Sequence, residues 1–482
     1  MTRSPVDAKL FEVERAGEPP PKEPVGVDKT FRAYDPHQSF LLPPSLDDWL
    51  PEGHVARFIS EVVDELLDLS EIYASYESAS GAPPYDPRLM LKLVLYGYST
   101  GVTSSREMQR RCCDDVAFRW LAANAAPDYR SISRFRRRHL GALDALFVQA
   151  LALCAEAGLV SLGRVALDGT KLRASASRHK AMSYDRLGPR IAEIETQVKA
   201  MLAEAEALDA AEDARFGEDR RGDELPEELA TREARLVKLR AAKAAIEAEA
   251  GATAAAKAAE KARSKGADDA EAEAAATEAA QKAAPDGRAQ RSFTDPDARM
   301  MKTTDGFHYA YNAQAVVDEG SQVVLAAQVV QSAADVDQLL PMISAADENL
   351  GAAGEDDTFD LVLADAGYCS EQNLLELKEA GVDALVATGR MRRGERTVSP
   401  KGRIPRGATP RELMARRLRT KAGRADYARR KVIVEPAFGQ MKVRQHAGRL
   451  RLRGLAGARG EWTLHVLCHN LRKLANARRA FT

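Results

Sequence analysis

A long central stretch, residues 186–290, has almost no aromatic residues and interrupts this 482-residue chain with a segment that cannot build a core of large apolar side chains. Between Tyr184 and Phe293 the only aromatic residue is Phe216, and alanine, glutamate, lysine and arginine dominate. Such a composition forms helix readily but lacks the large side chains that fill a core. The runs IAEIETQVKAMLAEAEAL and LATREARLVKLRAAKAAIEAEA predict an inserted, coiled-coil-like helical arm. Low complexity over residues 252–284 predicts partial disorder there.

The residues before this stretch fall into two segments. Residues 1–40 are rich in proline and polar side chains, which predicts a flexible N-terminal arm. Residues 41–160 are patterned as helices, with apolar residues recurring every three to four positions. A helix is predicted from Ser133, and its first turns carry a run of arginines: Arg134, Arg136, Arg137 and Arg138. Short helices followed by an arginine-rich one favour a helix-turn-helix-like DNA-binding domain, and a plain helical bundle with a charged face fits nearly as well.

The remaining residues alternate between strand and helix patterns. Apolar or alternating runs predict five strands, at residues 164–172, 309–318, 322–331, 359–365 and 383–387. The second and third strands are separated by Glu319-Gly320-Ser321, which predicts a hairpin. Helical patterns follow the third and fourth strands. The expected fold is therefore a mixed α/β sheet formed by residues 161–185 and 291–482, interrupted after its first strand by the helical arm.

The distribution of charge indicates a polyanionic partner. The net charge is -1, from 70 Lys and Arg against 71 Asp and Glu, but the two signs are separated along the chain. Residues 391–460 hold 21 Lys and Arg and only four acids. A solvated charged face remains an alternative, and the size of the imbalance favours contact with a nucleic acid backbone.

Other features bear on where the protein acts. No stretch approaches 18 uncharged apolar residues, so no membrane contact is expected. The first residues lack the apolar core of a secretory signal. The five cysteines have neither disulfide-framework nor zinc-ligand spacing, which predicts reduced thiols and a cytoplasmic protein.

Two aspartates lie within or at the end of predicted strands. Asp168 is in VALDGT and Asp365 in VLADAG. A charged residue in a buried strand costs several kcal/mol unless it is paired or binds a metal. The glycine close behind each aspartate allows a phosphate or a metal to approach the backbone. Each aspartate alone could simply open a turn, and two such sites in one sheet make that reading less favourable.

The third candidate is Glu435, the only acid between Asp426 and Glu461. Three converging carboxylates can hold two Mg²⁺ ions, which stabilise the attacking and leaving oxygens of a phosphoryl transfer. The alternative for Glu435 is an ion pair within its helix, four residues from Lys431. His465 and His469 also have the i, i+4 spacing of metal ligands, but the acid of a zincin motif is lacking and packing roles are favoured.

Several motifs together resemble a known family. The runs LDGTKLRA, TDPDARMMKTTDGFHYAYNAQAVVD, LVLADAGYCS, YARRKVIVEPAFGQMK and HNLRKL are similar in kind and order to the RNase-H-like DDE transposases of bacterial insertion sequences. The closest subgroup carries a Tyr-Arg-Glu-Lys signature around its glutamate. The resemblance covers the chain except for about the first 30 residues and the alanine-rich insertion.

This resemblance implies a function and a set of site residues. Asp168, Asp365 and Glu435 would be the catalytic acids, holding Mg²⁺ or, in its place, Mn²⁺. The helical N-terminal domain would recognise the terminal inverted repeats, and a homodimer would form on DNA to join both ends to target DNA near the bacterial nucleoid. Residues expected to contact DNA near the cut are Tyr427, Arg430, Lys431 and Lys442. A catalytically inactive, DNA-binding repressor derived from such an enzyme, and a coiled-coil scaffold, are the alternatives.

The spacing before Glu435 departs from the signature. Four residues rather than three separate Arg430 from Glu435, and Lys431 restores the usual gap. At about 100° per residue, Lys431 falls on the same helix face as Glu435, while Arg430 lies roughly 140° away. We therefore expect Lys431 to point into the site. A kink at Pro436 would reverse this and bring in Arg430.

Overall fold

The structure is a computed structural model that describes residues 45–76, 83–176, 181–216, 227–390 and 398–481. The chain divides into two units, Met1–Ser45 and Leu46–Thr482, and every element named below belongs to the second. The expected N-terminal arm, residues 1–40, lies outside the described residues.

The first part of the second unit is helical, as the sequence predicts. Its elements are α1 (Leu46–Trp49), α2 (Val55–Glu61), the π-helix η1 (Val62–Leu66), α3 (Ser70–Ala74), α4 (Pro87–Ser99), α5 (Ser105–Asp114), α6 (Val116–Leu121), α7 (Tyr129–Arg138) and α8 (Ala142–Glu156). Helix α7 begins at Tyr129, earlier than the predicted Ser133, because the Asp128 carboxylate caps it by accepting from the N–H groups of Arg130 and Ser131. Among the described residues no single helix is long and apolar enough to span a membrane; only α7 and α8, bent at 78°, meet those criteria as a pair.

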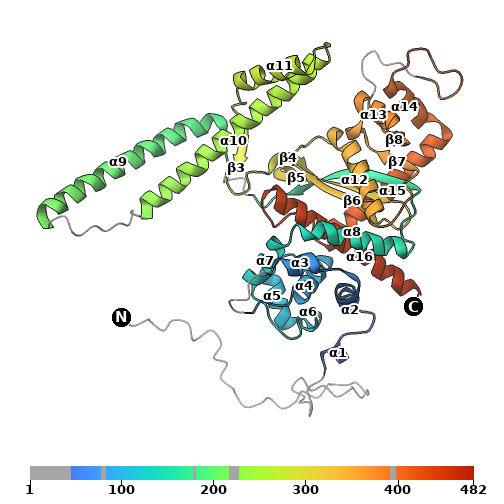
Figure 1. Ribbon diagram of the computed structural model, residues 1–482, viewed down its shortest axis with the longest axis horizontal. Coiled ribbons are helices and arrows are strands. Elements are labelled where there is room, and N and C mark those ends of the chain that lie inside the picture. The colour runs from blue at the N-terminus through green and yellow to red at the C-terminus, as the bar shows by residue number, and fades with distance from the viewer. Residues whose placement is uncertain (1–44, 77–82, 177–180, 217–226, 391–397, 482) are drawn as a thin grey trace, which may run out of the picture. The chain divides into compact units, whose positions relative to one another are not determined.

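The central insertion forms three helices: α9 (Tyr184–Phe216), α10 (Glu227–Arg263) and α11 (Asp269–Lys282) (Figure 1). Helices α9 and α10 pack through a small aliphatic cluster that includes Leu187, Ile194, Leu236, Leu239 and Ile246. Residues 252–284 are largely helical, so the expectation of partial disorder there is corrected. Alanine-rich sequence has the highest helix propensity, and the contact between α10 and α11 stabilises it further.

All five predicted strands are present in one mixed sheet. The predicted strands are β1 (Arg164–Arg173), β5 (Gly306–Asp318), β6 (Val324–Val330), β7 (Leu361–Ala364) and β8 (Ala384–Val386). The structure adds three short strands that were not predicted: β2 (Ala181–Ser183), β3 (Gln290–Ser292) and β4 (Arg299–Thr303). The order is β5-β1-β7-β8, with β1 antiparallel to β5 and parallel to β7. Strands β4 and β6 pair with successive parts of the other edge of β5, and β2 pairs only with β3.

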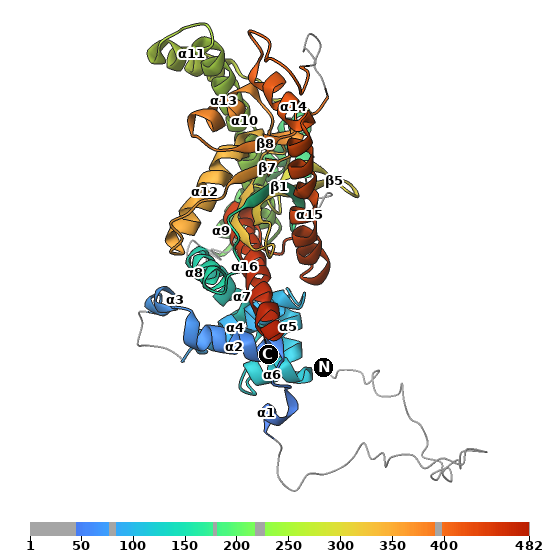
Figure 2. The ribbon, with the colours of Figure 1, turned by 90° about the vertical axis from the view of Figure 1, so that its right-hand side faces the viewer.

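Helices cover both faces of this sheet. The elements after β6 are the 3₁₀ turn η2 (Val336–Gln338), α12 (Leu339–Ala352), the 3₁₀ turn η3 (Ala366–Tyr368), α13 (Glu371–Glu379), α14 (Pro410–Arg419), α15 (Lys421–Arg444) and α16 (Gly454–Phe481). Residues of α15 and α16 share a core with one face, and residues of α12 and α13 share a core with the other (Figure 2). The polar ends of β1 and β7 therefore lie between two helical layers.

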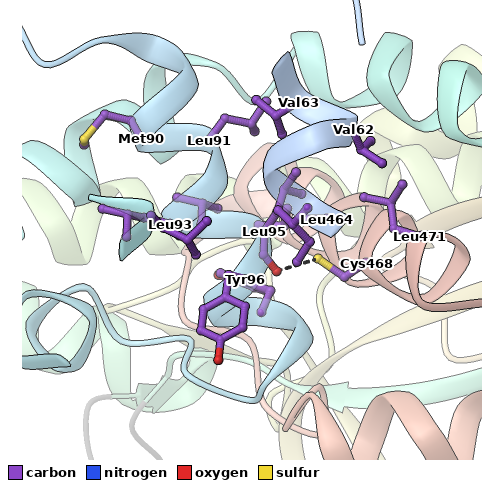
Figure 3. Packing of buried hydrophobic residues seen from close by; sticks show 14 of the residues in the cluster. Val62, Val63, Met90, Leu91, Leu93, Leu95, Tyr96, Leu464, Cys468 and Leu471 are labelled. Carbon is purple, nitrogen blue, oxygen red and sulfur yellow. Dashed lines mark hydrogen bonds between the residues drawn. The ribbon is translucent and has the colours of Figure 1, made fainter. Parts of the chain in front are cut away.

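Helix α16 belongs to two cores. Its Trp462 and Val466 pack with the sheet. Its Leu464, Cys468 and Leu471 pack with the N-terminal helices, where Cys468 lies against Leu95 (Figure 3). The helical part and the sheet are therefore joined through the interior.

Candidate active site

Asp168 and Asp365 lie side by side where the parallel pairing of β1 with β7 ends, Asp168 within β1 and Asp365 just after β7. Leu167 of β1 pairs with Ala364 of β7, so the residue that follows each of them in the chain is one of the two aspartates. The Asp365 carboxylate accepts from the N–H of Gly367 at 2.8 Å and caps η3. Burial raises the pKa of Asp168. The positive charge of Arg430 opposes this rise in pKa, and the negative charge of Asp365 adds to it. The two acids therefore repel each other in a partly desolvated setting, where a cation would relieve the repulsion.

Arg430, rather than Lys431, points into this site. Its Nη1 donates to Oδ2 of Asp168 at 2.8 Å, and the two side chains are only 12% and 22% exposed. Lys431, the next residue of α15, is exposed. The expectation that Lys431 would enter the site is therefore corrected.

The apolar residues of α15 explain this orientation. The helix is continuous from Lys421 to Arg444, with Pro436 inside it. Its buried side is formed by Ile433, Val434, Ala437, Phe438 and Met441. Arg430 lies one turn before Val434 on that same side, so packing on the sheet carries Arg430 to Asp168 in β1.

Glu435 is exposed on α15. Among the described residues no three Asp, Glu, His or Cys side chains form a group that could hold a metal ion. The structure thus brings together two of the three predicted acids. Mg²⁺ commonly takes one or two protein carboxylates and keeps several waters, so Asp168 and Asp365 form a donor set that fits a hard divalent cation.

The other two signature residues lie beside this pair. The Lys442 amine donates to Oγ1 of Thr170, two residues after Asp168 on β1. Burial lowers the pKa of Lys442, and the Asp168 charge opposes this shift. Burial raises the pKa of Tyr427; the charge of Arg430 opposes this rise, and the charges of Asp365 and Asp168 add to it. Tyr427, Arg430 and Lys442 therefore share the electrostatic environment of the two acids.

The four arginines of α7 that were predicted to contact DNA differ in their accessibility. Arg134 and Arg137 are exposed, and exposed Arg138 lies over the ring of Tyr76 at 4.6 Å. Arg136 is buried: its Nη1 donates to the Tyr98 hydroxyl at 2.7 Å and to the Thr103 carbonyl at 2.8 Å. The prediction that Arg136 contacts DNA is therefore corrected. Its position on the same side as buried Ile132 and Phe135 is the sequence signal that could have identified it.

Asn312 and Gln314, which were not predicted as site residues, lie in β5 beside the site and have no exposed surface. Two amides in an otherwise apolar strand, YAYNAQAVV, were the available signal. His465 and His469 are buried as expected, and burial lowers the pKa of His465 to about 3. His469 is held between the Gln440 side chain and the Gln322 carbonyl.

Two family models match the chain. A transposase domain (DUF772) matches residues 44–138, which include most of the N-terminal helices. A transposase DDE domain matches residues 285–471, which hold Asp365 and Glu435. No curated protein and no solved structure matches. The N-terminal transposase domain, the DDE domain, and the pairing of β7 with β1, which places Asp168 from outside the matched ranges beside Asp365, together identify this chain as a member of the insertion-sequence DDE transposases.

Proposed function

We propose that this protein cuts DNA at the ends of an insertion sequence and joins the freed ends to target DNA. The observation that carries the proposal is the pairing of Asp168 with Asp365 on adjacent parallel strands, with Arg430 beside them. The strand order, with β1 between an antiparallel and a parallel neighbour, is consistent with the RNase-H-like fold of such enzymes.

Asp168 and Asp365 would hold the Mg²⁺, with Glu435 as the third acid that the family resemblance implies. When bound, the divalent ion activates water or a 3′-hydroxyl as nucleophile and neutralises charge on the phosphate. The protein fixes the position of the carboxylates: β1 and β7 set their spacing, and Arg430 holds one oxygen of Asp168. Glu435 would join them only through a change at α15, because it is exposed in this structure.

The basic residues of the site would orient the DNA backbone. Lys442 lies against β1 two residues beyond Asp168, so its amine is suited to a phosphate next to the scissile bond. Lys421, Arg424 and Lys431 are further exposed cations of α15, and Arg429, also exposed, pairs with Glu319. These groups would bind phosphates in a sequence-independent way, with affinity that falls as salt rises.

The N-terminal helices would recognise the ends themselves. Arg134, Arg137 and Arg138 are exposed on α7 and are suited to phosphates or base edges. Two ends must be brought together before strand transfer, so we propose a homodimer on DNA.

Cleavage of a labelled duplex tests this function. The duplex should carry the inverted repeat that flanks the gene, and purified protein should nick it at the repeat boundary with Mg²⁺ or Mn²⁺ but not with EDTA. Asp168→Asn should abolish nicking and preserve the mobility shift of the duplex. A parent protein that binds the repeat and never cuts it with either metal would instead be a repressor derived from a transposase.

A further inference from the structure

A second polar cluster lies on the face of the sheet opposite α15. Lys171 and Gly169 of β1 pair in register with Asn312 and Gln314 of β5, and the side chains of the two amides are completely buried. These residues face the loop that leads into η2, where Asp335 is found. The cluster therefore begins at Gly169, the residue that follows Asp168 in β1.

Asp335 is the centre of this cluster. Its Oδ1 accepts from Nδ2 of Asn312 at 2.7 Å, from Nε2 of Gln314 at 2.8 Å, and from the Lys171 amine at 3.1 Å. The Asp335 side chain is 23% exposed and that of Lys171 is 20% exposed. Buried amides are costly without partners, so Asp335 fixes the orientation of both amides at the site.

The cluster reaches the Asp365 turn through Tyr368. Tyr368 is fully buried, and its hydroxyl donates to Oε1 of Gln314, whose Nε2 donates to Asp335. The carboxylates of Asp335 and Asp365 also both lie next to Gly367. A Cβ added at Gly367 would lie 3.0 Å from Oδ1 of Asp365 and 3.3 Å from Oδ2 of Asp335.

The same cluster holds the backbone next to Asp168. A Cβ added at Gly169 would lie 2.5 Å from Nε2 of Gln314 and 2.9 Å from Oδ1 of Asp335. Cβ contacts this short are essentially never seen, so a larger residue after Asp168 would displace the Gln314 amide and the Asp335 carboxylate packed against it. This accounts for a glycine that the sequence alone suggested was open to a phosphate or metal.

We propose that Asp335 is a positioning residue for the two acids, acting through Gln314 and Tyr368 on Asp365 and through Gly169 on Asp168. This inference rests on the proposed function, because it assigns the cluster to the spacing of Asp168 and Asp365 for a divalent cation. Groups that orient metal ligands typically change metal affinity by about 10- to 100-fold when removed. A purely structural role would alter stability and leave metal affinity unchanged.

Direct Mn²⁺ binding tests the proposal. Free Mn²⁺ is measured by electron paramagnetic resonance in titrations of the full chain, without DNA, and cleavage is measured separately against Mn²⁺ concentration. Asp335→Ala should raise the Mn²⁺ concentration for half-saturation about tenfold or more, while cleavage at saturating Mn²⁺ falls much less. Asp337→Asn is the matched control, because Asp337 is an exposed acid two residues away, and it should bind as the parent does.

Tyr368→Phe provides a second variant if Asp335→Ala does not fold. It keeps the buried ring and removes only the hydroxyl that joins Gln314 to the Asp365 turn, and it should also weaken Mn²⁺ binding. Folded Asp335→Ala and Tyr368→Phe proteins with parental Mn²⁺ affinity would overturn the positioning role. If Asp168→Asn binds Mn²⁺ as tightly as the parent does, Asp168 is not a metal ligand. Both the proposed metal site and the positioning role of Asp335 are then refuted.

Discussion

Replacing Arg430 by alanine removes the one cation that contacts Asp168 among the described residues, and replacing Lys431 by alanine removes its exposed neighbour. The Arg430 guanidinium lies 2.8 Å from Oδ2 of Asp168, with both groups largely buried. Hydrogen bonds to charged groups contribute about 1.5–3 kcal/mol. At roughly 1.4 kcal/mol for each factor of ten in rate, Arg430→Ala should slow strand cleavage about 10- to 150-fold.

Lys431→Ala should have a much smaller effect. Its side chain is exposed, and surface substitutions change free energies by about 0.5 kcal/mol or less, roughly a twofold change in rate. Arg430→Lys should fall between the parent and Arg430→Ala, because an ammonium keeps the charge but lacks the planar fork that meets a carboxylate.

The assay is single-turnover nicking of a labelled end duplex at saturating Mg²⁺, with thermal unfolding by circular dichroism to compare stabilities. If Lys431→Ala is the slower enzyme at equal stability, then α15 rotates on binding DNA and the contact between Arg430 and Asp168 does not belong to the active state.

Three further predictions follow from the acids, the arm and α16. Asp168→Asn, Asp365→Asn and Glu435→Gln should each abolish cleavage and leave the affinity for end DNA, measured by mobility shift, within a few-fold of the parental value. If a variant still cuts at more than a few per cent of the parental rate, the residue it replaces is not a metal ligand. Deleting residues 192–284 with a short Gly/Ser link should leave a protein that unfolds cooperatively in calorimetry, because none of the three main cores has a member in that range. The melting temperature of the deleted protein should fall, because Arg291 and Arg299 lose their ion pairs with Glu249. Gradual, non-cooperative melting would mean that the helical arm is an integral part of the fold. Glu461→Gln should destabilise the protein by about 1.5–3 kcal/mol in urea unfolding, because its buried Oε2 accepts from two backbone N–H groups; an unchanged midpoint would refute that assignment.

The main strands and the first two acids could be predicted because both depend on local pattern. The apolar runs of β1 and β7 required burial, and an aspartate at the same point of each run had to meet the other once the strands were parallel neighbours. Strand β4 was missed because its five residues, RMMKT, include the charged Arg299 and Lys302 and pair with β5 through a short turn before Gly306.

The orientation of α15 could not be predicted from the signature residues. Tyr427, Lys431, Glu435 and Lys442 share a helix face, but the free energy of packing comes from Ile433, Val434, Phe438 and Met441. These apolar residues select the side that faces the sheet, and the charged residues follow. For the same reason Arg136 was misassigned: the buried side of α7 includes it.

The course of α16 was beyond local pattern altogether, and it bears on how end recognition and cleavage are related. Glu461, at the level where α16 passes between the two cores, accepts from the Tyr98 hydroxyl at 2.9 Å, and Tyr98 accepts from Arg136 of α7. One buried chain of contacts therefore runs from the arginine-bearing helix to α16, whose Trp462 donates to the carbonyl of Gln314 in β5. The side chain of that same Gln314 contacts Asp335 and Tyr368. The helix that carries the exposed arginines and the strand that borders the two acids are thus linked by interior hydrogen bonds, so a DNA end bound at α7, as proposed, would be connected to the acids through packed structure rather than through a flexible linker.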